Sequence, residues 1–229
     1  MASNRVVLIL GAGPRVGASL ADAFSRGGYK VALASRSGKP SSEGHLSLSA
    51  DFTKPESIPE IFTSVRSHFK IAPSVVIYNA ASATPPPDEA SVLSIPAESV
   101  ASDLNVNTVS PYVAAQQAII GWNTLPSDLK KTFIYTGNIL NITVIPIPIF
   151  LNLGVGKAAS AYWIGSADTM YADKGFRFFY ADERFPDGRS KAQELDGPAH
   201  GKFYSQLAEH NGEVPWHATF VKDQGYVKF

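Results

Sequence analysis

The feature that most constrains the fold is an apolar run followed at once by a glycine-rich turn and an amphipathic segment. The run Val6-Val7-Leu8-Ile9-Leu10 is continuously apolar, which favours a strand covered on both faces, as in a parallel sheet. After the turn, apolar side chains recur at helical spacing over residues 16–24, Gly27-Gly28 ends the segment, and a second apolar strand follows at 30–34. The sequence therefore predicts a βαβ unit at its start.

The same alternation continues along the chain. The apolar patterns predict further strands near 46–50, 75–78, 132–135 and 176–180, and helices near 55–69, 100–122 and 157–171. Residues 139–153 are almost entirely apolar, but Pro146 and Pro148 disfavour a regular helix or a central strand there, so we expect a loop. Residues 185–229 are more polar and rich in turn signals. We expect a single domain over residues 1–229 with an α/β fold, a Rossmann-like doubly wound parallel β-sheet flanked by helices on both faces.

Composition narrows the classes of function. The 229 residues include no cysteine, which excludes disulfides, thiolate nucleophiles and cysteine-based metal centres. The five histidines show no metal-binding spacing, so we expect no metal site, and 20 basic against 20 acidic side chains argue against nucleic acid as a partner. No apolar run approaches the roughly 18 to 20 residues that cross a bilayer, and the N-terminal segment is interpreted as a strand rather than a secretory signal. We expect a cytoplasmic protein with no membrane partner and a small-molecule ligand.

The turn after the first strand is Gly11-Ala12-Gly13-Pro14-Arg15-Val16-Gly17. Glycines let the backbone approach an anion, and the free N–H groups and dipole of the following helix favour its charge. In this context the turn predicts a pyrophosphate site that includes Gly11, Gly13, Val16 and Gly17. The alternative is a tight strand-to-helix turn that binds nothing.

The second predicted strand ends in Ser35 and is followed by Arg36. A dinucleotide-binding fold selective for NAD has an acidic residue at this place, which holds the ribose hydroxyls. A small residue followed by a guanidinium instead leaves room for a 2′-phosphate and pairs with its charge. The pattern favours NADP(H) as cofactor, and the alternative is a solvated surface arginine.

Together these residues resemble the short-chain dehydrogenase/reductase family over roughly residues 5 to 182. The resemblance implies that the Asp51 side chain and the Phe52 backbone N–H bind the adenine, and that Asn107 distorts its helix and anchors a proton-relay water. It implies that the backbone after the fourth strand packs along the adenosine ribose, at Asn79, Ala80 and Ala81. Arg15 stands in place of the middle glycine of the family's turn, so its side chain points away from the pyrophosphate, across it, or toward a 2′-phosphate.

The family's Tyr-x-x-x-Lys motif is matched only in part. Lys157, at the start of the predicted helix, aligns with the lysine that binds the nicotinamide ribose, but Leu153 stands where the motif has its proton-donating tyrosine. Counting from the strand end places Asn138 where the family has a serine that polarises the substrate carbonyl, with Thr136 and Asn141 as alternatives.

The family's Pro-Gly after the sixth strand is replaced by Asp182-Glu183-Arg184. Either Asp182 or Glu183 is a candidate substitute acid, since burial would raise its pKa. The alternative is an ion pair with Arg184 that fixes the following loop. The candidate catalytic residues are therefore Lys157, Asn107, Asn138 and Glu183.

These observations predict an NADP(H)-binding oxidoreductase of the short-chain dehydrogenase/reductase type, acting on an apolar carbonyl, alcohol or imine with a non-standard proton donor. The alternatives are a non-redox enzyme on the same fold, such as a cyclase or isomerase, and a catalytically inactive nucleotide-binding protein. The apolar segment 139–153 would form a wall of the substrate pocket, or serve core or interface packing. The resemblance implies a homodimer or homotetramer formed through helices such as 157–171, whose apolar residues could equally pack on their own sheet.

Overall fold

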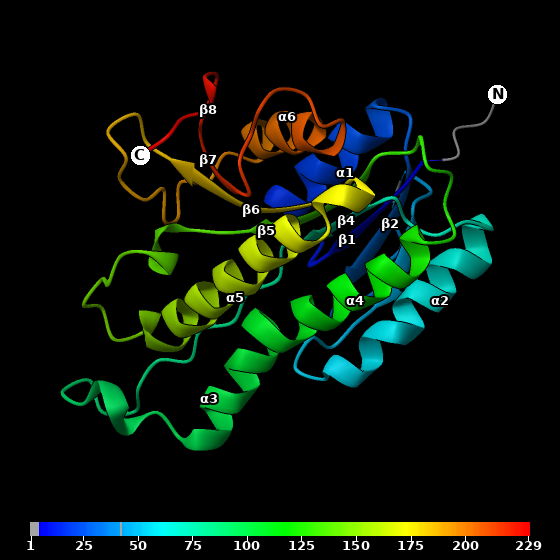
Figure 1. The fold of residues 1–229 in the computed structure, drawn as a ribbon. Coiled ribbons are helices and arrows are strands. Elements are labelled where there is room, and N and C mark those ends of the chain that lie inside the picture. Colours follow the sequence, from blue (N-terminus) through cyan, green and yellow to red (C-terminus); the bar gives the residue numbers. More distant parts are fainter. Residues whose placement is uncertain (1–4, 42) are drawn as a thin grey trace.

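The computed structural model describes residues 5–41 and 43–229 and arranges its strands in one sheet (Figure 1). Within these residues the sheet has eight strands in the order β3-β2-β1-β4-β5-β6-β7-β8, all parallel to their neighbours except β8. The strands are β1 (Val6–Leu10), β2 (Lys30–Ser35), β3 (Leu46–Ser49), β4 (Val75–Tyr78), β5 (Lys131–Thr136), β6 (Phe176–Arg184), β7 (His217–Val221) and β8 (Gly225–Tyr226). The chain winds outward from β1 in one direction and from β4 in the other, which confirms the predicted doubly wound α/β fold.

Helices cover both faces of the sheet (Figure 1). They are α1 (Val16–Arg26), α2 (Ile58–Phe69), α3 (Ala97–Leu104), α4 (Ser110–Trp122), α5 (Phe150–Met170) and α6 (Gly197–Ala208). Helices α1 and α6 pack on one face, and α2, α4 and α5 pack on the other. All five residues of β1 are buried, as expected for a strand between two helical layers. The assignment of residues 1–229 to a single domain stays a prediction, because residues 1–4 and 42 lie outside the described part of the chain.

The helix predicted over 157–171 begins earlier, at Phe150, so the prediction that Lys157 opens it was wrong. The proline-containing loop is correspondingly short and lies between a 3-10 turn at Ile139–Asn141 and α5. The physical reason is that proline is excluded from a helix interior but tolerated just before its first turn, where Pro148 lies. Lys157 consequently lies about two turns inside the helix.

The single helix predicted over 100–122 is interrupted. It consists of α3, a π-helical segment at Asn105–Val109 and α4. The expected distortion around Asn107 is therefore present, although its form could not be read from the residue pattern. Strand β6 also extends past the predicted end at Tyr180, so Asp182 and Glu183 belong to the last residues of the strand.

The polar C-terminal stretch contains a helix that the hydrophobic pattern did not predict. Helix α6 begins after Asp196, whose side-chain Oδ1 accepts a hydrogen bond from Ala199 N at 2.8 Å, and it has Pro198 in its first turn. An aspartate before a proline-containing first turn is a helix-start signal that sequence reasoning could have used. Helix α6 matters for the site because its N-terminal end lies against the carboxyl end of β6 and the start of α1.

Across residues 5–41 and 43–229, no helix is both long and apolar enough to cross a membrane. The same residues contain no cluster of three or more histidine, aspartate or glutamate side chains that could hold a metal ion.

Candidate functional site

The three glycines of the turn between β1 and α1 serve different purposes. Gly11 has a positive φ of 97°, and a Cβ there would lie 2.4 Å from the backbone nitrogen of Ala80. A Cβ on Gly17 would lie 2.7 Å from the Cα of Ala12, so this glycine allows the helix to pack against the turn. A Cβ on Gly13 would meet nothing within 4 Å, because this glycine faces open space. The turn thus presents bare backbone at Gly13, beside the N-terminus of α1, which no side chain of the described residues caps.

Two cavities lie on either side of this turn. The first cavity has a volume of about 460 Å³, and the second has a volume of about 610 Å³. Gly13, Pro14 and Ala81 line both, so the two cavities meet at the glycine turn. Together they follow the carboxyl ends of the strands across the point where the winding direction changes, the usual ligand site in such sheets.

The first cavity gathers many of the predicted cofactor residues. It is lined by Gly11, Ser35, Arg36, Asp51, Phe52, Ala80 and Ala81 among others. Arg36 is exposed, and Thr53, whose backbone N–H and hydroxyl both donate to Asp51 Oδ1, lowers the pKa of that carboxyl. The Asn79 amide donates to Gly11 O at 2.9 Å and so fixes the turn from the β4 side. Asn79 itself lines the second cavity.

Arg15 does not contribute to the first cavity. Its Nη1 donates to Gln193 O at 3.0 Å, and its side chain lines the second cavity with Val16 and Gly17. The suggestion that Arg15 approaches a 2′-phosphate stays a prediction, and in this structure the side chain lines the second cavity instead of the one that Arg36 lines. The contact instead ties the glycine turn to the loop between β6 and α6.

Lys157 lies at the base of the second cavity and is buried, with 3% of its surface exposed. Its Nζ donates to Thr136 O at 2.7 Å and lies 4.3 Å from the centre of the Tyr135 ring. Burial lowers the pKa of this ammonium group to about 7, against the opposing charge of Asp182. A buried amine that titrates near neutrality is typical of functional sites.

Asn107 lines neither cavity but organises the backbone behind them. Its amide accepts from Ser82 N at 3.0 Å and donates to Ser82 O at 2.7 Å, which holds the segment that follows β4. Its backbone oxygen accepts from the Tyr135 hydroxyl and the Ser160 hydroxyl, each at 2.8 Å. Those two bonds occupy both lone pairs of the carbonyl, so protein hydroxyls take the places that a relay water would use there.

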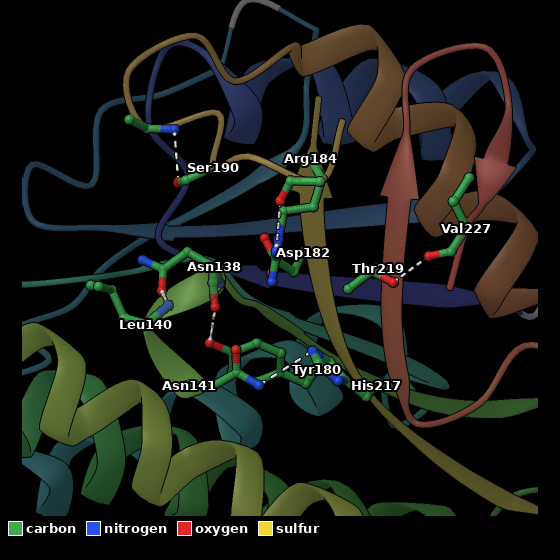
Figure 2. Close-up of polar contacts among 12 residues, drawn as sticks. Asn138, Leu140, Asn141, Tyr180, Asp182, Arg184, Ser190, His217, Thr219 and Val227 are labelled. Atoms are coloured by element: carbon green, nitrogen blue, oxygen red, sulfur yellow. Dashed lines mark hydrogen bonds and ion pairs between the residues drawn. The ribbon is translucent and has the colours of Figure 1, made fainter. Parts of the chain in front are cut away.

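Asn138 and Leu153 both line the second cavity, as Lys157 does. The Asn138 Oδ1 accepts from Leu140 N at 3.1 Å, and its backbone is held by the Tyr180 hydroxyl (Figure 2). The alternatives differ: Thr136 lines the same cavity, but its hydroxyl accepts from Tyr204. Asn141 pairs with His217 at 3.2 Å, outside this cavity.

Asp182 and Glu183 extend from β6 to opposite sides. Asp182 belongs to the face that carries Lys157, and its Oδ2 lies 2.6 Å from both Nε and Nη2 of Arg184 (Figure 2). Glu183 Oε2 accepts from Asp196 N at 2.8 Å and lies 3.5 Å from His200 Nδ1, so this side chain is directed at α6. Burial raises the pKa of Glu183, and it raises that of Asp182 to about 6 although the charges of Arg184 and Lys157 lower it.

The two Asp182 oxygens are not equivalent. Arg184 holds Oδ2, and Arg184 Nη1 in turn donates to Gly188 O at 3.0 Å, so the ion pair anchors the loop after β6. Asp182 Oδ1 forms no hydrogen bond within the described residues. The atom is also not completely enclosed by protein. This oxygen therefore keeps access to the second cavity that Asp182 lines.

Apolar side chains form part of the wall of the second cavity. They belong to Leu140, Ile145, Ile147, Phe150 and Leu153. The loop that contributes Ile145 and Ile147 is the proline-stiffened segment, so part of its apolar character serves the cavity rather than the core. The same segment also exposes Val144 and Ile142 to solvent, at 93% and 63%.

Sequence reasoning missed several polar residues at the site, chiefly Tyr135, Ser160 and Tyr180. A signal was present, because β4, β5 and β6 each carry two apolar residues followed by a tyrosine. The three runs are Val76-Ile77-Tyr78, Phe133-Ile134-Tyr135 and Phe178-Phe179-Tyr180. Tyrosines at equivalent places on neighbouring parallel strands meet at one edge of the sheet.

Comparison with known proteins agrees with this architecture. No protein-family model matches the chain. A curated protein of Cryptosporiopsis sp. (strain 8999), short chain dehydrogenase/reductase dmxR12, is 39% identical over 240 residues, which cover 99% of this chain and 96% of that protein.

Solved structures share the fold at lower identity. The 3-ketoacyl-(acyl-carrier-protein) reductase from Brucella melitensis complexed with NADH has a TM-score of 0.77 at 16% identity, over 96% of this chain and 97% of that one. A metagenomic short-chain oxidoreductase in complex with NADP has a TM-score of 0.76 at 15% identity, with the same coverage. From the identity and the coverage of the first relative, the chain belongs to the short-chain dehydrogenase/reductase family of oxidoreductases.

Proposed function

We propose that this protein is an NADP(H)-dependent oxidoreductase that interconverts an apolar carbonyl compound and its alcohol, or reduces an apolar imine. The observation that carries the proposal is the pair of cavities that meet at Gly13, one bordered by Arg36 and the other by Lys157, Asn138 and Asp182. The adenosine half of a dinucleotide would occupy the first cavity, and its nicotinamide half would occupy the second. The pyrophosphate between them would lie at the glycine turn where the cavities meet.

The residues present fit a dinucleotide. Gly13 leaves its side open for close approach of phosphates, whereas Gly11 and Gly17 are needed for packing of the turn itself. The α1 N-terminus offers uncapped N–H groups beside it. Arg36 lies exposed at the rim of the first cavity, and Ser35 is too small to block a 2′-phosphate. These features support NADP(H) over NAD(H), because a guanidinium pairs with phosphate and an acidic residue would repel it.

When bound, the nicotinamide cofactor supplies the hydride for such a reaction. Lys157 would hold the nicotinamide ribose at the base of the second cavity, and the Asn138 amide would donate a hydrogen bond to the substrate oxygen. Leu153 cannot donate a proton, so the acid must be another group. Both carboxyl candidates line the second cavity. We assign this role to Asp182, because its Oδ1 accepts no hydrogen bond within the described residues, whereas the Glu183 carboxylate is held by Asp196 N and lies close to His200 and Lys191.

The substrate side of the proposal rests on the lining of the second cavity. Part of its wall consists of aliphatic and aromatic side chains, and a volume of about 610 Å³ lies within the range of sites for small organic molecules. Such a wall favours an apolar substrate, whose single polar group would face Asn138 and Asp182.

A second candidate is a nucleotide-binding protein without turnover. The observation that favours it is Leu153, which lines the cavity where the family motif has its acid. A non-redox cyclase or isomerase would use the same apolar cavity for orientation. Nucleotide binding and turnover separate these candidates, so both are measured below.

The first test is a thermal-shift titration with NADPH, NADP⁺, NADH and NAD⁺ in parallel. We expect a selective shift with NADP(H), since a ligand at 100 times its dissociation constant adds about 2.7 kcal/mol of stability. Replacing Arg36 by alanine is expected to weaken the NADPH shift and leave the NADH shift in place. Arg26, exposed on α1 away from both cavities, gives a matched control in Arg26→Ala. No shift with any dinucleotide would refute the proposal.

The oligomeric state is proposed from the outer faces of α4 and α5. Ala161 and Ile164 are buried against the sheet, so these two pack within the chain rather than between subunits. Tyr162 and Met170 on α5 and Ile120 on α4 remain 81%, 78% and 55% exposed. We propose that this face joins two copies into a homodimer, or a homotetramer through a further contact, and cytoplasmic localisation stays a prediction.

Replacing Tyr162 by aspartate is expected to shift the protein toward monomer in analytical ultracentrifugation, because a charge would then be buried at the interface. Lys174→Asp, which changes charge just beyond the end of α5, is the control. Equal sedimentation of the wild-type protein and the Tyr162 variant would place the interface elsewhere.

A further inference from the structure

Three tyrosines form a stack across the sheet beneath the second cavity. Tyr78 on β4, Tyr135 on β5 and Tyr180 on β6 are register partners across neighbouring strands. The first two rings are parallel with centroids 5.9 Å apart, and the second two lie 5.6 Å apart at 19°. All three side chains are fully buried. The stack is therefore a rigid floor under the carboxyl edge of the sheet.

Each hydroxyl of this stack holds backbone at the site. Tyr78 donates to Val106 O at 2.6 Å, and Tyr135 donates to Asn107 O at 2.8 Å, so both fix the π-helical segment. Tyr180 differs, because its hydroxyl accepts from Asn138 N at 3.1 Å and donates to Asn138 O at 2.8 Å (Figure 2). One hydroxyl thus holds both backbone polar groups of one residue.

The approach of Tyr180 to Asn138 depends on Gly137. A Cβ on Gly137 would lie 2.2 Å from a carbon of the Tyr180 ring, so any larger residue would push the ring away. His217 packs edge-on against the other side of the ring, with centroids 5.7 Å apart. The Tyr180 ring is therefore packed against Tyr135, Gly137 and His217.

We call the two hydrogen bonds between the Tyr180 hydroxyl and the Asn138 backbone the clamp. A third hydrogen bond, from Leu140, sets the direction of the Asn138 side chain on this fixed backbone. Its Oδ1 is held by Leu140 N at 3.1 Å, which turns the Nδ2 group the other way (Figure 2). Nδ2 has no hydrogen-bond partner within residues 5–41 and 43–229. The atom is also not completely enclosed by protein. Since Asn138 lines the second cavity, its two N–H donors face that space.

We infer that Tyr180 is a positioning residue that holds Asn138 so that its Nδ2 group donates a hydrogen bond to the substrate oxygen. The inference deepens the proposed function and rests on it. A donor fixed before the reaction stabilises the negative charge that develops on the oxygen as hydride arrives at the carbonyl carbon. An amide gives up no proton, so the proton that completes the alcohol comes from another group.

The test compares Tyr180→Phe with the wild-type protein, using NADPH and cyclohexanone as the carbonyl probe. The phenyl ring keeps the stack, so the variant loses the clamp alone. We expect kcat to fall about 10- to 100-fold with an unchanged dissociation constant for NADPH, since a misplaced donor weakens transition-state binding and not cofactor binding. Tyr29→Phe is the matched control, because the Tyr29 hydroxyl also donates to a protein oxygen, Oε1 of Glu209, and neither residue lines either cavity.

A double-mutant cycle separates positioning from a general loss of stability. If Tyr180 acts through Asn138, Tyr180→Phe should lower kcat little further in an Asn138→Ala background. Additive losses in kcat would overturn the inference. An equal loss in Tyr29→Phe would do the same, because it would mean that any buried hydroxyl matters.

A measurement without substrate separates this inference from the proposed function. The side-chain amide of Asn138, assigned by its absence from the spectrum of Asn138→Ala, should show a high ¹⁵N order parameter that falls in Tyr180→Phe and not in Tyr29→Phe. An unchanged order parameter would overturn the clamp. If the order parameter falls but wild-type protein reduces no ketone, the clamp stands while the proposed reaction and the donor role of Asn138 fail.

Discussion

Replacing Lys157 by methionine is expected to lower NADPH-dependent turnover by about 10²- to 10⁴-fold while making the folded protein more stable at pH 7. The loss of turnover follows from the loss of the Lys157 ammonium group in the second cavity, which we propose holds the nicotinamide ribose. Methionine has a similar length and no charge, so it fills the same space. Steady-state kinetics and urea unfolding on the same preparations measure both effects.

The gain in stability follows from the pKa of Lys157. Burial lowers this pKa from 10.5 to about 7, so the unfolded chain binds the proton more tightly than the folded chain between these values. Wild-type stability should therefore rise with pH from about 7 toward 10. Methionine removes the free-energy cost of burying or deprotonating this ammonium group. We expect the free energy of unfolding to rise by about 2 to 4 kcal/mol at pH 7, after allowance for the hydrogen bond lost at Thr136. The advantage should shrink at pH 9.

Lys131 gives a matched control at the opposite end of β5. It is also buried, but its Nζ donates to Pro126 O at 2.7 Å and Leu129 O at 3.0 Å, away from both cavities. Lys131→Met should therefore keep turnover and lose about 1 to 3 kcal/mol, because two carbonyls lose their donor. Full turnover in Lys157→Met would refute the role that we propose for Lys157.

Most of the fold could be predicted from the sequence because the signals for strands and turns lie in short stretches of residues. The continuous burial of β1 follows from an uninterrupted apolar run, and the positive φ at Gly11 follows from a turn that only glycine tolerates. The start of α5 was predicted too late because Pro146 and Pro148 led us to expect a loop over 139–153, whereas the helix begins directly after them, at Phe150. A Cβ on Gly156 would lie 2.4 Å from the Asn107 Cβ, so close packing and not a turn requires this glycine.

The candidate site could be predicted from the sequence only for residues whose place follows from a nearby strand or motif. Arg36, Asp51 and Lys157 could be placed from their distance to a strand or motif. The contacts of Arg15 with the loop at Gln193 and of Tyr180 with Asn138 join residues 178 and 42 positions apart. No pattern in one sequence reports such pairs, because they depend on how strands align across the sheet.

The choice between Asp182 and Glu183 shows the same limit. Adjacent residues on a strand point to opposite faces, so one of the two must face away from Lys157. The sequence cannot tell which, because the face depends on the register of β6 against β5. In the structure Asp182 shares the face of Lys157, with Arg184 on the same strand and the hydroxyls of Tyr180 and Tyr204 as the other titratable groups near it.

Replacing Asp182 by asparagine is expected to lower the rate of carbonyl reduction by about 10²- to 10⁴-fold and to remove one step from its pH profile. The reductive step needs the protonated carboxyl, so the wild-type rate should fall as pH rises through about 6, the pKa to which burial raises Asp182. In the oxidative direction the carboxylate acts as base, so that rate should rise through the same pH. Lys157 titrates near 7, and the two groups interact, so the steps belong to the pair.

A second Asp–Arg pair in the chain provides the control. Asp168 accepts from Arg177 Nε at 2.8 Å and from Phe178 N at 2.9 Å, outside both cavities. Asp168→Asn should lose stability and keep the wild-type pH profile, whereas Asp182→Asn should keep NADPH binding and lose the step near pH 6. A loss confined to Glu183→Gln would assign the proton to Glu183 instead. Unchanged profiles in both carboxyl variants would leave water as the donor, with Lys157 and Asn138 stabilising the charge that water must neutralise.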